Sequence, residues 1–389
     1  MMYLPEKSIK LLEFDKIRQM LCDCARTEGA RAAALALMPE SDLVRVLNMQ
    51  RRTSDAKRIA AEKGQPPFGG VKDITPHCER AEKGAMLTQR ELLDVADILR
   101  TSRVLLDYSR TNRRFETVLD EVFERLLPDK KLEDKIRTAI ISEETMADDA
   151  SPELYNIRRK MRQTTAKVRD ILAKYTTGAY SKSLQENIVT IRNGRFVVPV
   201  KAECKNDIKG LVHDASATGA TLFIEPLAVV DANNEIRELE AKEKHEIERI
   251  LRDLSAGVAV SGENIAHDYL NITELAFIFA CAELSYQMDA APANISDSRV
   301  IDLYKARHPL LDKKTVVPIT VKLGDGYGMM VITGPNTGGK TVTLKTIGLF
   351  ALMNQAGLHI PAGDTSSLGV FDEIFSDIGD EQSIEQSLS

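Results

Sequence analysis

The chain has no tryptophan, and aromatic residues make up only 5% of its 389 residues. Its longest apolar run, LAFIFACA at residues 275–282, is far too short to span a bilayer. The opening stretch, MMYLPEKSIK, lacks the hydrophobic core of a signal peptide. These absences argue against a membrane or secreted protein and favour a cytoplasmic globular one, since 43% of the residues are apolar and 28% are charged.

Cysteine is also scarce, and its spacing argues against a zinc site and against a disulfide framework. The five cysteines are Cys22, Cys24, Cys78, Cys204 and Cys281, and no CxxC pair of the zinc-binding type occurs. Cys22 and Cys24 are too close together on a predicted helix to share a disulfide comfortably. We therefore expect reduced thiols.

Charge is unevenly distributed along the chain. The formal net charge is −6, yet residues 151–210 carry thirteen Lys or Arg against five Asp or Glu, a net charge of +8. A basic segment on an acidic protein favours a local anion-binding surface. A solvated helix face explains the same count and is the favoured interpretation on charge alone, with the anion-binding surface as the alternative.

The middle of the chain is predicted to form a helix, then a small sheet, then a second helix. In SPELYNIRRKM, Ser151 can cap a helix and Pro152 suits its first position. Apolar residues then follow in alternating steps of three and four, which is typical of a helix packed on a partner helix: Leu154, Ile157, Met161, Thr164, Val168, Ile171 and Tyr175.

Asn193-Gly194 lies between two β-branched runs and predicts a hairpin. KGLVHD and ATLFIEP predict two further strands, and a long charged helix follows Pro226. This order predicts an arm of two long helices carrying a small β-tip, with a compact α+β domain as the alternative.

The C-terminal part begins like a P-loop α/β domain. RVIDLYKARHPLL, VVPITVKLG and YGMMVITG are strand-like, and KTVTLKTIGLFALMNQAG is an apolar helix. Between them, residues 334–341 (GPNTGGKT) fit the phosphate-binding pattern GxxxxGK[ST]. Lys340 would contact the β- and γ-phosphates of ATP, and Thr341 would offer its hydroxyl to Mg²⁺.

A hydrolytic P-loop site also needs an acidic residue after a neighbouring strand. The one candidate is LGVFDEIF at 368–375, where Asp372-Glu373 follow apolar residues. An ordinary edge strand is the favoured interpretation of that stretch. We therefore expect a domain with a Walker A loop and no Walker B residue.

These blocks together resemble the short second branch of the bacterial MutS family. The resemblance covers essentially the whole chain, through segments such as PPFGGVKDI, GRFVVPVK, LVHDASATGATLFIEP, ARHPLL, VITGPNTGGKTVTLKTIGL and IFSDIGDEQSIEQSLS. It implies a mainly α fold with α/β character, a coiled-coil lever with a small β clamp, and a partial P-loop (ABC-type) ATPase domain. The implied divisions are 1–130 and 236–295 for a helical core, 131–235 for the lever and clamp, and 296–389 for the ATPase domain.

The resemblance also implies functional residues. The nucleotide loop maps to Gly334, Pro335, Asn336, Thr337, Gly338, Gly339, Lys340 and Thr341, with Asn336 near the attacking water or γ-phosphate. Val316 and Val317 fall in the adenine-contacting segment, although a plain sheet strand explains them as well, and His308 reads as a structural turn residue. Ser389 aligns with the signature serine that acts in trans in a dimer, and Gln382 is expected near the nucleotide. Walker B, a histidine switch and any Smr-type nuclease are expected after Ser389, so this chain is expected to bind nucleotide without hydrolysing it alone.

The family's partners are branched DNA, whose recombination it suppresses, and collided ribosomes, which it splits. Candidate phosphate contacts in this chain are Arg158, Arg159, Lys160, Arg162, Arg192, Arg195 and Lys201. Two alternatives stay open. One is a non-catalytic dimerisation or interaction module with a vestigial P-loop, and the other is a mismatch-repair protein proper.

Overall fold

The computed structural model describes residues 6–111, 115–334 and 339–378. It is mainly helical, with two small sheets and one helix of 61 residues, α10 (Leu227–Gln287). The chain divides into two compact units. The first comprises Met1–Glu79, Asp94–Glu133 and Ser261–Ser389, and the second comprises Arg80–Leu93 and Asp134–Val260. The division into a helical core, a lever with its clamp and an ATPase domain remains a prediction.

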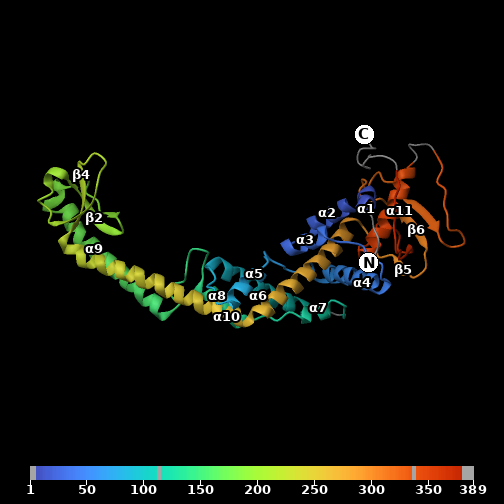
Figure 1. The fold of residues 1–389 in the computed structure, drawn as a ribbon, viewed down its shortest axis with the longest axis horizontal. Coiled ribbons are helices and arrows are strands. Elements are labelled where there is room, and N and C mark those ends of the chain that lie inside the picture. The colour runs from blue at the N-terminus through green and yellow to red at the C-terminus, as the bar shows by residue number, and fades with distance from the viewer. Residues whose placement is uncertain (1–5, 112–114, 335–338, 379–389) are drawn as a thin grey trace. The chain divides into compact units, whose positions relative to one another are not determined.

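The first unit combines helices with a mixed sheet (Figure 1). Its helices include α1 (Glu6–Leu11), α2 (Phe14–Cys24), α3 (Glu28–Leu35), α4 (Leu43–Lys63), α7 (Asp120–Glu124) and α11 (Lys340–Gln355), together with most of α5 (Thr75–Glu82) and α6 (Gln89–Arg110). The strand order is β5-β8-β6-β7, from β5 (Asn294–Ser296), β8 (Ser367–Gly369), β6 (Ile301–Ala306) and β7 (Ile319–Leu323). β5 runs parallel to β8, and the other neighbours are antiparallel.

Helix α11 is the centre of the first unit's core. Leu349, Phe350, Leu352 and Met353 are fully buried, and the helix packs against α2, α4 and β8. Gly348 permits the close approach, because a Cβ there would lie 2.7 Å from the Leu12 side chain. The apolar helix predicted from KTVTLKTIGLFALMNQAG is confirmed.

Two strand predictions in the first unit were wrong. Residues 329–332 form no strand, and Met329 and Val331 are 80% and 77% exposed. An apolar stretch becomes a strand only where a neighbouring strand accepts its backbone hydrogen bonds, and among the described residues this sheet ends at β7. The strand predicted at 368–375 is shorter, and β8 lies between β5 and β6 rather than at an edge.

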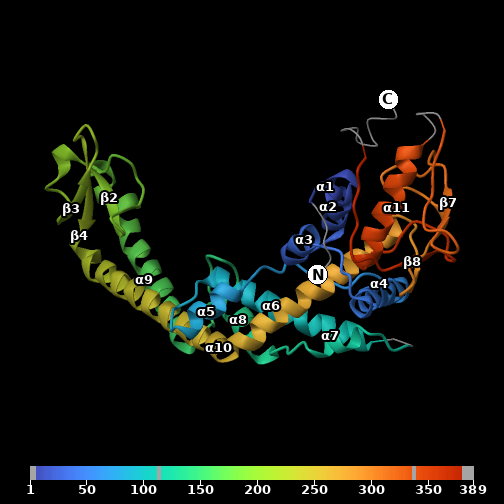
Figure 2. The ribbon, with the colours of Figure 1, turned by 45° about the vertical axis from the view of Figure 1, so that its right-hand side comes forward.

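The second unit pairs two long helices with an antiparallel sheet. Helix α9 (Pro152–Thr177) lies alongside the first half of α10, and the sheet lies at the end of this pair (Figure 2). The sheet order is β1-β2-β4-β3, from β1 (Thr190–Arg192), β2 (Arg195–Lys201), β3 (Gly210–Ala215) and β4 (Thr221–Pro226). The predicted helices and strands of this region are confirmed, and most of α8 (Lys130–Ala139) completes the unit.

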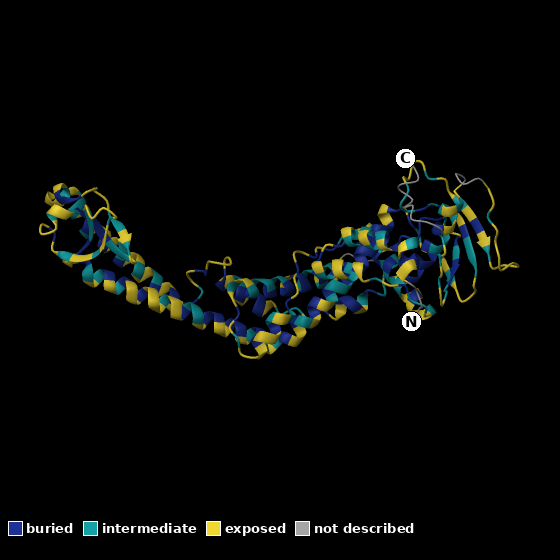
Figure 3. Ribbon diagram, turned by 45° about the horizontal axis from the view of Figure 1, so that its top comes forward, coloured by how far each residue is buried: buried dark blue, intermediate teal, exposed yellow. Residues whose placement is uncertain are grey.

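Local signals explain these elements. The Ser151 hydroxyl accepts a hydrogen bond from the Leu154 amide at 3.0 Å, which caps α9 as predicted. Every residue of the predicted apolar seam of α9 is buried or half-buried, and buried and exposed positions alternate along both helices (Figure 3). Asn193 and Gly194 have φ of 51° and 71°, as expected of a two-residue hairpin turn with left-handed backbone.

The core of the second unit lies where the sheet covers the end of the helices. Val168 and Leu172 of α9 are fully buried there against Val198, Val200 and Ile224 of the sheet. Ile171 and Tyr175 extend this contact as partly buried neighbours. The sheet is therefore fixed to α9 by apolar packing.

Candidate nucleotide site and nucleic-acid interface

The described part of the P-loop has the backbone that phosphate binding needs. Gly334 and Gly339 have φ of 148° and 75°, a region that favours glycine. No neighbouring atom lies within 4 Å of a Cβ placed at either position, so the requirement is conformational rather than steric. Pro335, Asn336, Thr337 and Gly338 lie outside the described residues.

Lys340 begins α11 and folds back over the loop. Its ammonium group donates a hydrogen bond to the Gly334 carbonyl at 2.6 Å, so the side chain reaches from the end of the motif to its start. Thr341 is exposed in the first turn of α11, where the helix dipole favours anions. This set of donors fits a nucleotide's phosphates, with the Thr341 hydroxyl available to Mg²⁺.

The other candidate residues for the nucleotide site precede or follow the P-loop in the sequence. Val316 is half-buried and Val317 is 79% exposed in the turn before β7, so the alternative of a plain sheet strand is wrong for both. Asp372 and Glu373 are exposed and follow the end of β8 by three and four residues. Ser389 and Gln382 lie outside the described residues.

His308 is a buried turn residue, as expected. It is 2% exposed, and its Nδ1 accepts a hydrogen bond from the Leu310 amide at 3.4 Å. Burial lowers the pKa of His308 to about 4, so the ring is neutral near neutral pH.

Sequence reasoning missed a buried ion pair on the P-loop helix. Lys345 of α11 is 3.2 Å from the Glu13 carboxylate, and both side chains are almost fully buried. Burial alone would raise the pKa of Glu13, but the ammonium groups of Lys16 and Lys345 hold it below the usual value. Glu13 has a φ of 59° just before α2, so this pair fixes the start of α2 to the P-loop helix.

In the second unit, the predicted phosphate contacts fall into two groups. Five of the seven form ion pairs. Arg158 pairs with Asp148 and Glu243, each at 2.7 Å, and Arg162 shares Asp148 at 2.8 Å. Lys160 pairs with Glu235 at 2.7 Å.

The two arginines of the hairpin are also paired. Arg192 lies 3.6 Å from Asp214 and over the Phe223 ring at 4.1 Å. Arg195 is bound through two hydrogen bonds, of 2.7 and 3.0 Å, by the Glu225 carboxylate. Arg159, by contrast, is exposed, and Lys201 is half-buried. Neither forms an ion pair in the part of the chain that the structure describes.

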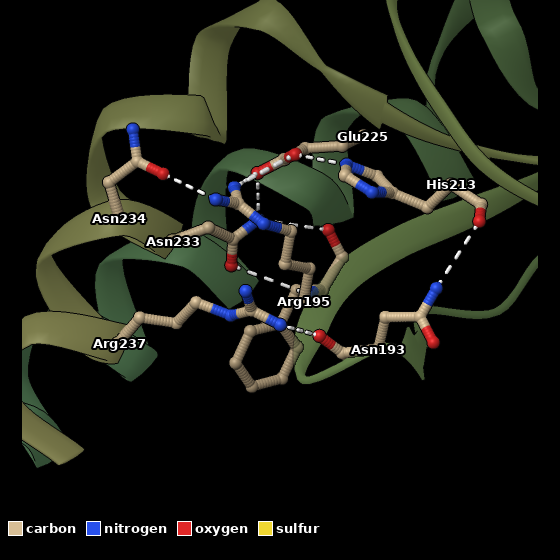
Figure 4. A network of polar contacts seen from close by, with 8 residues as sticks. Asn193, Arg195, His213, Glu225, Asn233, Asn234 and Arg237 are labelled. Carbon is tan, nitrogen blue, oxygen red and sulfur yellow. Dashed lines mark hydrogen bonds and ion pairs between the residues drawn. The ribbon is translucent and has the colours of Figure 1, made fainter. Parts of the chain in front are cut away.

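Glu225 is the centre of a polar network that sequence reasoning also missed (Figure 4). Its side chain is fully buried and also contacts His213 and Asn233. Burial would raise the pKa of Glu225, but hydrogen bonds from Asn233, His213 and Arg195 lower it overall. Asn233 in turn bonds both backbone groups of Phe196, so the network joins β2, β3, β4 and α10.

Comparison with known proteins agrees with this site. The family model described as MutS domain V matches residues 330–389, which begin just before the P-loop. Three relatives, each named endonuclease MutS2, come from Acetivibrio thermocellus, Clostridium botulinum (strain ATCC 19397) and Lachnoclostridium phytofermentans. They are 47%, 46% and 44% identical to this chain. Each match covers 99% of this chain and 49% of the relative.

The P-loop, its helix and the domain V match define a nucleotide-binding protein of the MutS type. At these identities over almost all of its residues, the chain belongs to the MutS2 family. It spans about half the length of the relatives it matches. Among the described residues, no helix is both long and apolar enough to cross a membrane.

Proposed function

We propose that this chain is the nucleotide-responsive clamp part of a MutS2-type protein. ATP with Mg²⁺ would bind at the P-loop, and the helix pair α9–α10 with its sheet would serve as the lever and clamp that grip nucleic acid. The observation that supports this most is the combination, in one MutS2-family chain, of the Lys340 loop with a sheet fixed to the end of two long helices.

The nucleotide would be held by the residues assigned from the sequence. Lys340 would exchange the Gly334 carbonyl for the β- and γ-phosphates, Thr341 would bind Mg²⁺, and Val316 and Val317 would contact the adenine. Asn336 would position the attacking water, and Ser389 would act on the partner's nucleotide in a homodimer.

The proposed target is branched DNA, stalled ribosomes or both, in the bacterial cytoplasm. Both present dense phosphate, which the basic segment 151–210 would contact. Binding branched DNA would suppress recombination, and binding collided ribosomes would help to split them. The relatives are named endonucleases, and we propose no nuclease activity for this chain.

A junction-binding experiment tests this proposal. The chain is titrated into labelled four-way-junction DNA and into a linear duplex of equal length, with and without ATP and Mg²⁺, and anisotropy is recorded. We expect junction preference that changes with ATP and loses that change in Lys340→Ala. Lys313→Ala is the matched control, because Lys313 is a lysine of the same unit that pairs with Asp289. Equal binding to both DNAs with no ATP effect would refute the clamp function on DNA, and the same titration with ribosomes then tests the second target.

The ion pairs favour a second candidate, a non-catalytic interaction module. If the five paired cations serve only the fold, α9 and α10 could bind a protein or a second copy instead of nucleic acid. The salt dependence separates the two. Seven phosphate contacts predict a slope of log K against log salt near −6, two contacts predict about −2, and a protein-binding module predicts almost none for DNA.

A further inference from the structure

Two tyrosines form an exposed stack at the end of α9. A Cβ at Gly178 would lie 2.3 Å from the Lys174 carbonyl, so only glycine fits where the helix ends. The chain then turns through the 3₁₀ helix η1 (Ala179–Ser183), which places Tyr180 on Tyr175. The ring centroids are 5.0 Å apart and the planes meet at 23°.

The two rings differ in their surroundings. Tyr175 is half-buried against the core below the sheet. Tyr180 is 42% exposed, although it is a large aromatic residue. Because the Tyr180 ring is already stacked on Tyr175, its orientation is restricted before any ligand binds. A ligand that stacks on Tyr180 therefore costs that side chain little conformational entropy.

Three lysines lie in the same part of the chain as this stack. Lys174 is exposed and adjacent to Tyr175, and Lys182 is exposed two residues after Tyr180. The Lys201 ammonium donates a hydrogen bond to the Lys182 carbonyl at 3.1 Å, which brings a third cation to the same turn. None of the three forms an ion pair within the described ranges, unlike the five paired residues above. The nearby Asp207 carboxylate accepts a hydrogen bond from Ser183 at 2.7 Å.

We propose that Tyr180 is a stacking site for an unpaired nucleobase, with Lys174, Lys182 and Lys201 holding the flanking phosphates. A base inside a duplex has both faces covered by its neighbours, whereas an unpaired base offers a free face to an aromatic ring. The ligand is therefore a single strand next to a duplex, as occurs at a branch point. This inference rests on the proposed nucleic-acid function and names the substrate feature that the clamp sheet recognises.

Removing bases while keeping phosphates tests the stacking directly. Anisotropy titrations of the full chain compare three labelled probes: a blunt duplex, the same duplex with a short oligo-dT overhang, and one with an abasic overhang of equal length. We expect the dT overhang to bind about fivefold or more tightly than the abasic one. A 2-aminopurine placed in the overhang should also lose fluorescence on binding. An oligo-rU arm shows whether the site takes ribose as well as deoxyribose, and tight binding of either strand supports the proposal.

The variants separate stacking from charge. Tyr180→Ala should abolish the difference between dT and abasic overhangs, and Tyr180→Phe should keep it because the ring remains. Tyr155→Ala is the matched control, since Tyr155 is a similarly exposed tyrosine (44%) near the start of α9. Lys182→Gln should weaken binding of both overhangs alike and lower the salt slope by about one.

The outcomes distinguish this inference from the function on which it rests. Equal binding of dT and abasic overhangs by the wild type, or an unchanged preference in Tyr180→Ala, overturns the stacking site while leaving the clamp intact. If the wild type binds none of the probes, the proposed nucleic-acid function itself fails, and the stacking site fails with it.

Discussion

Replacing Glu225 should destabilise the β1-β2-β4-β3 sheet more than any surface change in the second unit. Its carboxylate is fully buried and is bound by Arg195, His213 and Asn233. In Glu225→Ala the Arg195 side chain, only 16% exposed, keeps its charge and its hydrogen bond to Asn234 but loses its carboxylate partner. Breaking one side of a buried ion pair costs about 3–5 kcal/mol of folding free energy.

A double-mutant cycle isolates the ion pair from the loss of packing. Arg195→Met in the Glu225→Ala background removes the unpaired charge, so we expect it to restore part of the lost stability, by roughly 1–3 kcal/mol. Arg195→Met in the wild type should instead destabilise, because Glu225 is then the buried charge without its cation.

Acid should weaken the Glu225 network in the wild type but not in Glu225→Ala, which lacks the carboxylate. The pKa of Glu225 is lower in the folded protein than its usual 4.5. A carboxylate with a depressed folded pKa contributes stability that is present above the unfolded pKa and lost as pH falls through the folded one. The wild type should therefore lose sheet stability below about pH 4.5, and the advantage of the wild type over Glu225→Ala should shrink there.

The assay has to report on this unit by itself, because a chain with two units need not unfold in one step. Amide hydrogen exchange, read by mass spectrometry on peptides covering β2 and β4, gives the local opening free energy. A cost below about 1 kcal/mol for Glu225→Ala, or no recovery with Arg195→Met, would refute the view that this pair holds the sheet together.

Three further predictions concern stability. Burial lowers the pKa of His359 to about 4, and a depressed histidine pKa means that stability falls as pH drops from 6.5 towards 4. His308, whose pKa burial also lowers to about 4, should act in the same way, so each of the two histidines should cost the wild type about 2 kcal/mol between roughly pH 7 and pH 5. His359→Gln should lose about 2 kcal/mol less than the wild type over this pH range in denaturant titrations, and an equal dependence of stability on pH in both proteins would contradict the assignment. Leu172→Ala should cost about 2–5 kcal/mol, while the exposed control Gln163→Ala changes stability by less than about 0.5 kcal/mol; similar costs would disprove the buried seam. Ser151→Ala should cost about 1–2 kcal/mol and speed amide exchange in the first turn of α9, and unchanged exchange at Leu154 would count against the cap.

Local patterns predicted the second unit well. The Ser151 cap, the apolar seam of α9 and the Asn193-Gly194 turn each depend on residues within a few positions of one another. Such local patterns predict the structure correctly where the backbone conformation that they favour is also the one found in the folded protein. The P-loop was likewise visible, since its glycines and lysine are contiguous.

Partners that are distant in the sequence were not predictable. Residues 329–332 have the composition of a strand, but a strand also needs a paired neighbour, and composition cannot supply one. Glu225 follows Arg195 by 30 positions, and the Glu13–Lys345 pair spans almost the whole chain. No periodicity marks either pair, and both become evident only when the helices and strands are placed in space.

The basic segment shows why a charge count is an incomplete guide to a binding surface. The net charge of +8 over residues 151–210 counts every cation equally, but five of its cations pair with carboxylates outside the segment, at Asp148, Asp214, Glu225, Glu235 and Glu243. A phosphate would have to compete with those carboxylates for paired cations, whereas a lysine without an ion pair has no carboxylate to give up. The nucleic-acid surface that we propose therefore lies nearer the end of α9 than its start, in the region of Tyr180, Lys174, Lys182 and Lys201.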